Sequence, residues 1–92
     1  MSYEILYHPD VKKIDLPLID QPNRDRIKRA IEQRLVSQPE VYAKPLRKTL
    51  RGYWRLRVGD YRIVFVIKEN QITILGIIHR RLIYKDIESR IG

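Results

Sequence analysis

The feature that most constrains the fold is the stretch WRLRVGDYRIVF at residues 54–65, in which apolar and basic residues alternate around a Gly-Asp pair. Alternation with period two on both sides of such a pair predicts two antiparallel strands joined by a two-residue turn. With this turn at residues 59–60, Arg57 lies directly opposite Arg62, and Arg55 lies on the same face. Like charges on paired residues destabilise a sheet, so three clustered guanidinium groups indicate a site for phosphate and not a structural role.

The same period continues into a third strand. The second strand runs through Ile67, a two-residue turn falls at residues 69–70, and a further strand covers residues 72–78. Extending the pairing across this turn places Arg62 opposite Ile77. One face of the sheet then has the composition of a core: Trp54, Leu56, Val58, Tyr61, Ile63, Phe65, Ile67, Ile72, Ile74 and Ile78. The other face carries Arg55, Arg57, Arg62, Val64, Val66, Thr73, Leu75, Ile77 and His79. This second face predicts a cleft that is basic at one end and apolar at the other. The apolar end is expected to be covered by another part of the structure or by a partner.

The segments around this sheet are predicted to be mostly helical. Residues 3–8 alternate as a short strand, and a brief helix follows from Pro9, with Val11, Ile14 and Leu18 on one face. A longer helix begins at Asn23 and ends near residues 37–38, before Pro39. The core-facing stripe of this helix is Ile27, Ala30, Ile31 and Leu35. Its other positions include Arg24, Lys28, Arg29, Glu32 and Arg34. The basic residues among them are interpreted as a solvated face, and a nucleic-acid role is the less favoured alternative.

Residues 38–51 lack a clear period and predict a long loop, and a short helix is expected from about Tyr84. Residues 1–92 are therefore expected to form a single α+β domain. Its small antiparallel-rich sheet would have two N-terminal helices packed on one face and a short C-terminal helix. No signal peptide or apolar run of membrane-spanning length is recognisable, and the 92 residues contain no cysteine, so a cytoplasmic location is expected.

The charge distribution favours a polyanionic partner. The formal net charge is +8, and the segment from Lys44 to Arg62 holds seven basic residues against one acid, Asp60, so it carries +6 of that total. The basic residues predicted to contact this polyanion outside the hairpin are Lys44, Arg47, Lys48, Arg51 and Arg81. Acidic residues do not cluster, and no metal-binding, Gly-rich phosphate or serine-nucleophile motif is present, so no metal and no cofactor are expected.

The remaining chemistry suits metal-free cleavage of RNA. The 2′-OH of the substrate is the nucleophile, so the protein must orient the phosphate, stabilise its charge and move protons. Arginine binds phosphate through two parallel hydrogen bonds but stays protonated and cannot be the base. His79 and Tyr84 are the candidate proton carriers, since His79 shares the face of the arginines in the predicted pairing.

The motifs at residues 50–52, 54–65 and 78–84 together make the sequence similar to the RelE toxins of the RelE/ParE toxin–antitoxin superfamily. The resemblance covers nearly the whole chain and implies the RelE fold. It also implies a ribosome-dependent endoribonuclease that cuts mRNA in the aminoacyl site, and a RelB-like antitoxin that blocks the active cleft.

The resemblance also implies roles for individual residues. Arg55 and Arg57 match two basic positions on the first hairpin strand, and Arg62 matches the arginine that holds the scissile phosphate. Arg80 matches a second phosphate-stabilising arginine, and Tyr84 matches an aromatic residue that orients the base. The first pair is often lysine in the best-known member of the family and is arginine here, so proton transfer moves to Tyr84 or His79. Strict alternation places Arg80 on the face opposite Arg62, unless a bulge or the strand end intervenes.

Two other functions stay open. One is a ParE-like, non-enzymatic inhibitor of DNA gyrase with the same fold, which would not need this set of arginines together with Tyr84. The other is an inactive toxin homologue that is kept as an antitoxin-binding module. Discrete cuts in translated mRNA would distinguish a ribonuclease from both.

Overall fold

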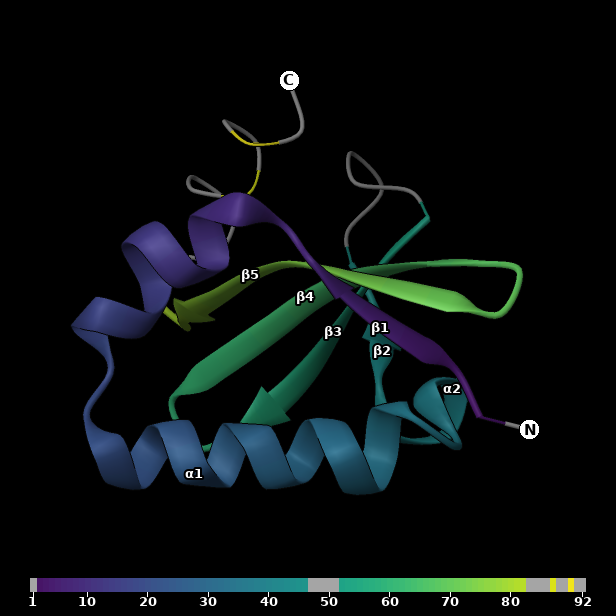
Figure 1. The fold of residues 1–92 in the computed structure, drawn as a ribbon, viewed down its shortest axis with the longest axis horizontal. Coiled ribbons are helices and arrows are strands. Elements are labelled where there is room, and N and C mark those ends of the chain that lie inside the picture. Colours follow the sequence, from purple (N-terminus) through teal and green to yellow (C-terminus); the bar gives the residue numbers. More distant parts are fainter. Residues whose placement is uncertain (1, 47–51, 83–86, 88–89, 91–92) are drawn as a thin grey trace.

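Five strands form one sheet in the order β1-β5-β4-β3-β2 (Figure 1). The computed structural model describes residues 2–46, 52–82, 87 and 90. The strands are β1 (Glu4–Tyr7), β2 (Lys44–Pro45), β3 (Tyr53–Val58), β4 (Tyr61–Lys68) and β5 (Gln71–His79). Only β1 pairs in parallel, with β5, and the other three pairings are antiparallel. The predicted α+β fold with a mainly antiparallel sheet is confirmed.

The helical segments lie mainly before the hairpin. They are η1 (Val11–Asp15), η2 (Leu16–Leu18), α1 (Gln21–Ala30), η3 (Ile31–Leu35) and α2 (Pro39–Tyr42). α1 begins two residues earlier than predicted because the Asp20 side chain caps it by accepting a hydrogen bond from the Asn23 backbone N–H (3.3 Å). Pro22 fits the first turn, where a missing N–H costs nothing.

The main core lies between these helices and one face of the sheet, with α1 running across that face (Figure 1). All four residues of the predicted stripe are buried, Ile27 and Ala30 in α1 and Ile31 and Leu35 in η3. They pack with buried residues of β3, β4 and β5, including Leu56, Phe65 and Ile74. Burial of this apolar surface is the main source of stability in a chain of this length.

The predicted apolar face of the first helix is wrong. Val11 is buried, but Ile14 and Leu18 are 48% and 78% exposed, and Asp15 and Ile19 are buried in their place. η1 is a π-helical turn, which has more residues per turn than an α-helix. Val11 and Asp15, four residues apart in this turn, are therefore both buried, and an acidic side chain enters the interior.

A bulge in β5 changes the predicted register. Phe65 pairs with Ile74 but Val64 pairs with Gly76, so Leu75 is the extra residue. Arg62 therefore lies opposite Ile78 and not opposite Ile77 as predicted. From the bulge to the end of β5, every side chain therefore lies on the face of the sheet opposite to the one predicted.

The second face of the sheet has a small apolar cluster of its own. Val64 and Ile78 are buried there beneath Leu46 and Ile87. The chain itself therefore covers the apolar end of this face, for which the sequence predicted a separate cover.

The predicted loop at residues 38–51 is wrong in part, because α2 and β2 lie within it. Of the predicted C-terminal helix only Ile87 and Arg90 are described, and both are helical. In the described part of the chain no helix is long and apolar enough to cross a membrane.

Candidate phosphate-binding site

The hairpin of β3 and β4 has the predicted geometry. Gly59 and Asp60 form the turn, Val58 pairs with Tyr61, and Arg57 lies directly opposite Arg62. Gly59 has a φ of +60°, a conformation that glycine adopts without steric cost. The two arginines therefore share one face at the end of the hairpin, next to the turn.

Arg62 is held in place by its own turn. Its Nη1 donates to the carbonyl oxygens of Gly59 (3.1 Å) and Tyr61 (3.0 Å). Among the described residues, nothing accepts a hydrogen bond from its Nη2 or Nε, so one side of the guanidinium remains available for an anion. Burial lowers the pKa of Arg62, and the nearby charges of Arg57, Arg55 and Arg80 lower it further, while Asp60 opposes them. An incoming phosphate would relieve this repulsion.

Arg80 reaches the same site because of the bulge in β5. The shifted register places Ile78 on the face of Arg62, and Arg80 follows two residues later. The Arg80 backbone N–H donates to the Asp60 carbonyl (2.8 Å), and its Nε lies 3.7 Å from Asp60 Oδ1. Arg80 also lies close enough to Arg62 to lower its pKa. The conflict between Arg80 and strict alternation is thereby resolved by a bulge.

The arginine side chains border a hollow of about 150 Å³ on the second face. Its lining residues, which we call the arginine patch together with Arg80, are Tyr42, Lys44, Arg55, Arg57 and Arg62. Lys44 belongs to the arginine patch because β2 pairs with β3 and places Lys44 opposite Arg55. Tyr42 was not predicted from the sequence, although it lies only two residues before Lys44. It is 49% exposed and is the described aromatic side chain available here for stacking on a base.

His79 does not lie on the arginine face, and that prediction is wrong. After the bulge it pairs with Tyr61, whose ring it meets edge-on at 5.8 Å between centroids. Its Nδ1 accepts a hydrogen bond from the Arg81 backbone N–H (3.3 Å). Tyr61 packs against the main core, so His79 lies on the opposite side of the sheet from Arg62.

The remaining predicted site residues divide into two groups. Arg81 is exposed in the turn after β5. Arg47, Lys48, Arg51 and Tyr84 lie outside the described residues. Among the described residues no three His, Asp or Glu side chains converge as metal ligands would.

The fold and the arginine patch define a small, basic protein with a candidate site for a polyanion. Residues 6–84 match the sequence profile of the family described as the ParE toxin of the type II toxin–antitoxin system, parDE. The chain belongs to this family, and it is a toxin of the RelE/ParE superfamily of type II toxin–antitoxin systems.

Solved toxin structures have the same fold. The chain is similar to the toxin–antitoxin complex RelBE2 from Mycobacterium tuberculosis, with 24% identity and a TM-score of 0.79, over 87% of this chain and 100% of the other. It is also similar to the RelB–RelE complex from Methanococcus jannaschii, with 29% identity and a TM-score of 0.70, over 88% and 96%. For the DinJ–YafQ complex of E. coli the values are 14% and 0.58, over 89% and 98%. No curated protein sequence matches this chain significantly.

Proposed function

We propose that this toxin is a ribosome-dependent endoribonuclease that inhibits translation by cutting mRNA. The observation that carries the proposal is the convergence of Arg55, Arg57 and Arg62 around one hollow, with part of the Arg62 guanidinium available for an anion. Arg80 lies close enough to lower the pKa of Arg62 as well. Mutual repulsion of these charges is a cost that a bound phosphate offsets. The resemblance to RelE toxins supports the same activity.

The arginine patch supports cleavage by the 2′-OH of the substrate. In this reaction the 2′-oxygen bonds to phosphorus, the bond from phosphorus to the 5′-oxygen breaks, and a 2′,3′-cyclic phosphate and a 5′-OH form. A base removes the proton of the 2′-OH, and an acid delivers one to the leaving 5′-oxygen. Arg62 and Arg80 would stabilise the charge that develops on the phosphate oxygens. Tyr84 is the remaining candidate for proton transfer, since His79 lies on the opposite side of the sheet.

A RelB-like antitoxin is the expected partner. Several similar structures are complexes with an antitoxin, by their own descriptions. We propose that the antitoxin places an acidic segment over the arginine patch. It has no need to cover the apolar end of this face, because Leu46 and Ile87 already do so.

Substitution of Arg62 tests the activity. Arg62→Ala is expected to abolish growth inhibition and to remove discrete cuts from translated mRNA in primer extension, because Arg62 is the principal phosphate ligand of the proposed site. Removal of a single preorganised donor of this kind typically lowers kcat by about 10²–10³. Lys68→Ala, at the far end of the same strand, is the matched control and should retain full toxicity. A fully toxic Arg62→Ala variant would contradict the proposed mechanism.

The alternative function is inhibition of DNA gyrase, which the family description favours, since that description names ParE. The same primer-extension experiment separates the two functions. Cuts within codons indicate a ribonuclease, whereas unbroken mRNA accompanied by DNA damage indicates a gyrase inhibitor. Unbroken mRNA without toxicity, but with antitoxin binding, would indicate an inactive homologue.

A further inference from the structure

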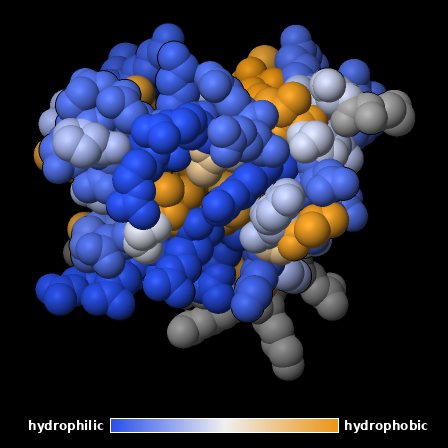
Figure 2. Space-filling view, turned by 90° about the horizontal axis from the view of Figure 1, so that it is seen from below, coloured by the Kyte–Doolittle hydropathy of each residue, from blue (hydrophilic) through white to orange (hydrophobic). Residues whose placement is uncertain are grey.

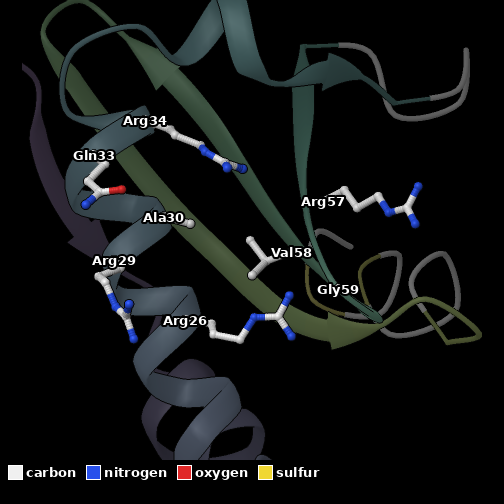
Figure 3. Close-up of a pocket in the computed structure, with 8 residues that line it drawn as sticks. All are labelled: Arg26, Arg29, Ala30, Gln33, Arg34, Arg57, Val58 and Gly59. Atoms are coloured by element: carbon white, nitrogen blue, oxygen red, sulfur yellow. The ribbon is translucent and has the colours of Figure 1, made fainter.

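A second basic hollow, of about 240 Å³, lies between α1 and the end of β3 (Figure 3). We call it the helix groove. It is lined by Arg26, Arg29, Ala30, Gln33, Arg34, Arg57, Val58 and Gly59. The face on which α1 lies is largely hydrophilic around a central hollow (Figure 2). The sequence favoured a solvated helix face here over a nucleic-acid role.

The helix groove is open because the edge of β3 is only partly paired. β2 pairs with Trp54 and Arg55 and, within the described residues, leaves positions 56–58 of β3 without a neighbouring strand on that side. Arg26 and Arg34 approach this edge from α1 and η3, while Arg57 extends from the other side of β3 (Figure 3). The groove therefore passes around the edge of the sheet.

Small residues bring the charges close together. Ala30 forms the floor at the helix, and Gly59 lies at the turn. A Cβ built on Gly59 would lie 3.4 Å from both Nη atoms of Arg26, so the Arg26 guanidinium rests directly over this turn. Arg26 and the arginine patch are therefore in contact with the same two-residue turn.

The charges of the helix groove are not balanced by acids. It contains four arginines, all exposed, and no carboxylate lines it. In the described part of the chain none of these arginines forms an ion pair. The two acids of α1 and η3, Asp25 and Glu32, line a different hollow beside η1 and η2. Arg29 has acids at the spacings that stabilise an exposed helix, Asp25 and Glu32, whereas Arg26 and Arg34 have no acid three or four residues away.

The helix groove and the arginine patch are adjacent. Arg57 lines both hollows. In addition, the Arg34 guanidinium lies 5.7 Å from the centroid of the Tyr42 ring, and Tyr42 lines the patch. A path of basic side chains thus runs from Arg62 around the edge of β3 to α1.

We propose that the helix groove is a second phosphate-binding site, which holds the sugar–phosphate backbone of RNA outside the arginine patch. This inference rests on the proposed ribonuclease function and extends its RNA surface to α1. Arginine forks bind backbone phosphates in two parallel hydrogen bonds and without reading sequence. The backbone can belong to the mRNA or to ribosomal RNA, which present the same chemistry.

An acidic protein segment fits the groove less well. Protein interfaces depend on apolar or aromatic anchors that fill buried pockets. The apolar residues of the helix groove, Ala30 and Val58, are themselves buried and belong to the main core. The groove thus offers charge and hydrogen-bond donors but little apolar surface for an anchor.

The test compares two double variants made in the Arg62→Ala background, so that RNA is bound but not cut. Arg26→Gln with Arg34→Gln removes two charges from the helix groove. Lys12→Gln with Lys28→Gln removes two charges from the other hollow and is the matched control. Fluorescence anisotropy with a short labelled oligouridine measures Kd at several salt concentrations, and co-sedimentation measures binding to ribosomes.

The groove variant is expected to weaken binding about tenfold or more and to reduce the slope of log K against log salt. Each phosphate of single-stranded RNA that is no longer neutralised reduces this slope by about 0.7. The control should retain the slope of its background. Arg26→Lys with Arg34→Lys should recover the slope, since the charge is kept, but not the full affinity. Thermal melting verifies that each variant is folded.

The outcomes separate the sources of RNA. Weaker binding to both the oligonucleotide and ribosomes assigns the groove to mRNA, and weaker binding to ribosomes alone assigns it to ribosomal RNA. Equal behaviour of the groove variant and the control in both assays overturns the inference. So does a defect that is confined to antitoxin binding, which would assign the groove to protein. If the protein with Arg62 intact binds RNA through the groove but never cuts translated mRNA, the proposed ribonuclease function is wrong, while the assignment of the groove as an RNA-binding site stands.

Discussion

The pairing of Arg57 with Arg62 shows a conflict between stability and binding at the scale of single residues. Directly opposed like charges destabilise a sheet, and burial of Arg62 increases the cost. Strained arrangements cluster at functional sites, so the least favourable pair of the hairpin supports the proposed phosphate site. Residue patterns identified this pair from the sequence because the turn at residues 59–60 sets the local register.

Removal of one of these charges should stabilise the free protein. Arg57→Gln is expected to raise Tm at low salt, because it removes a repulsion worth about 0.2–1 kcal/mol. Arg57 is exposed, so the gain in stability should lie near the lower end of this range. The gain should vanish at about 1 M salt, where the screening length is about 3 Å. Thermal unfolding followed by circular dichroism measures both. Lys68→Gln is the control, since Lys68 pairs with the uncharged Gln71, and an equal effect of the two variants would contradict this explanation.

At the scale of elements, the bulge in β5 determines which side chains reach the arginine patch. It is held by Asp15, whose Oδ2 accepts from the Ile77 backbone N–H (2.9 Å). Arg90 donates to both oxygens of Asp15 (2.8 and 2.6 Å) and to the Leu75 carbonyl (3.0 Å). A buried ion pair thus satisfies the carbonyl of the bulged residue, Leu75, and the N–H of Ile77, two residues later.

Breaking this ion pair should be costly. Asp15→Asn removes the carboxylate charge that accepts two hydrogen bonds from the Arg90 guanidinium, which is 7% exposed, while Asp10 lies further from it, at 3.6 Å. The expected loss of stability is about 3–5 kcal/mol, the range for removing one partner of a buried pair. Urea denaturation measures it. Asp25→Asn, on the exposed side of α1, is the control and should change stability by less than about 0.5 kcal/mol.

Gly76 should be sensitive for a related reason. A Cβ at this position would lie 2.7 Å from Arg90 Nη1, 2.8 Å from Ile78 Cδ1 and 2.9 Å from Ile87 Cδ1. Gly76→Ala is therefore expected to lower stability by about 1–3 kcal/mol through overpacking. The same denaturation experiment detects the change, and unchanged stability would show that Arg90 has another position available. Gly52→Ala is not a suitable control, because Gly52 has a positive φ of its own.

The elements show where sequence patterns reach their limit. The hairpin, the α1 stripe and the second turn follow from local rules of alternation and turn chemistry, and they were predictable. The bulge was not, because it depends on contacts between Asp15, β5 and Arg90, which are distant in sequence. One inserted residue exchanged the faces of Ile77 and Ile78, removed His79 from the site and brought Arg80 into it.

At the scale of the whole molecule, the net charge of +8 is organised around the edge of β3. The arginine patch lies on one side of this edge and the helix groove on the other. Such a concentrated field speeds the association of polyanions and weakens with salt. It also raises the free energy of the folded state, so an anion that binds the folded protein should stabilise it.

Inorganic phosphate at millimolar concentration is therefore expected to raise Tm of the purified toxin more than sodium chloride of equal ionic strength. A ligand at 100 times its Kd adds about 2.7 kcal/mol, and about 1 kcal/mol shifts Tm by roughly 4–8 °C in a domain of this size. Differential scanning fluorimetry measures the shift. Arg62→Ala should lose most of it, whereas Lys12→Gln with Lys28→Gln should keep it, because those lysines lie beside a different hollow. Equal shifts in all three proteins would mean that phosphate acts through general solvent effects and that the arginine patch is not a preformed anion site.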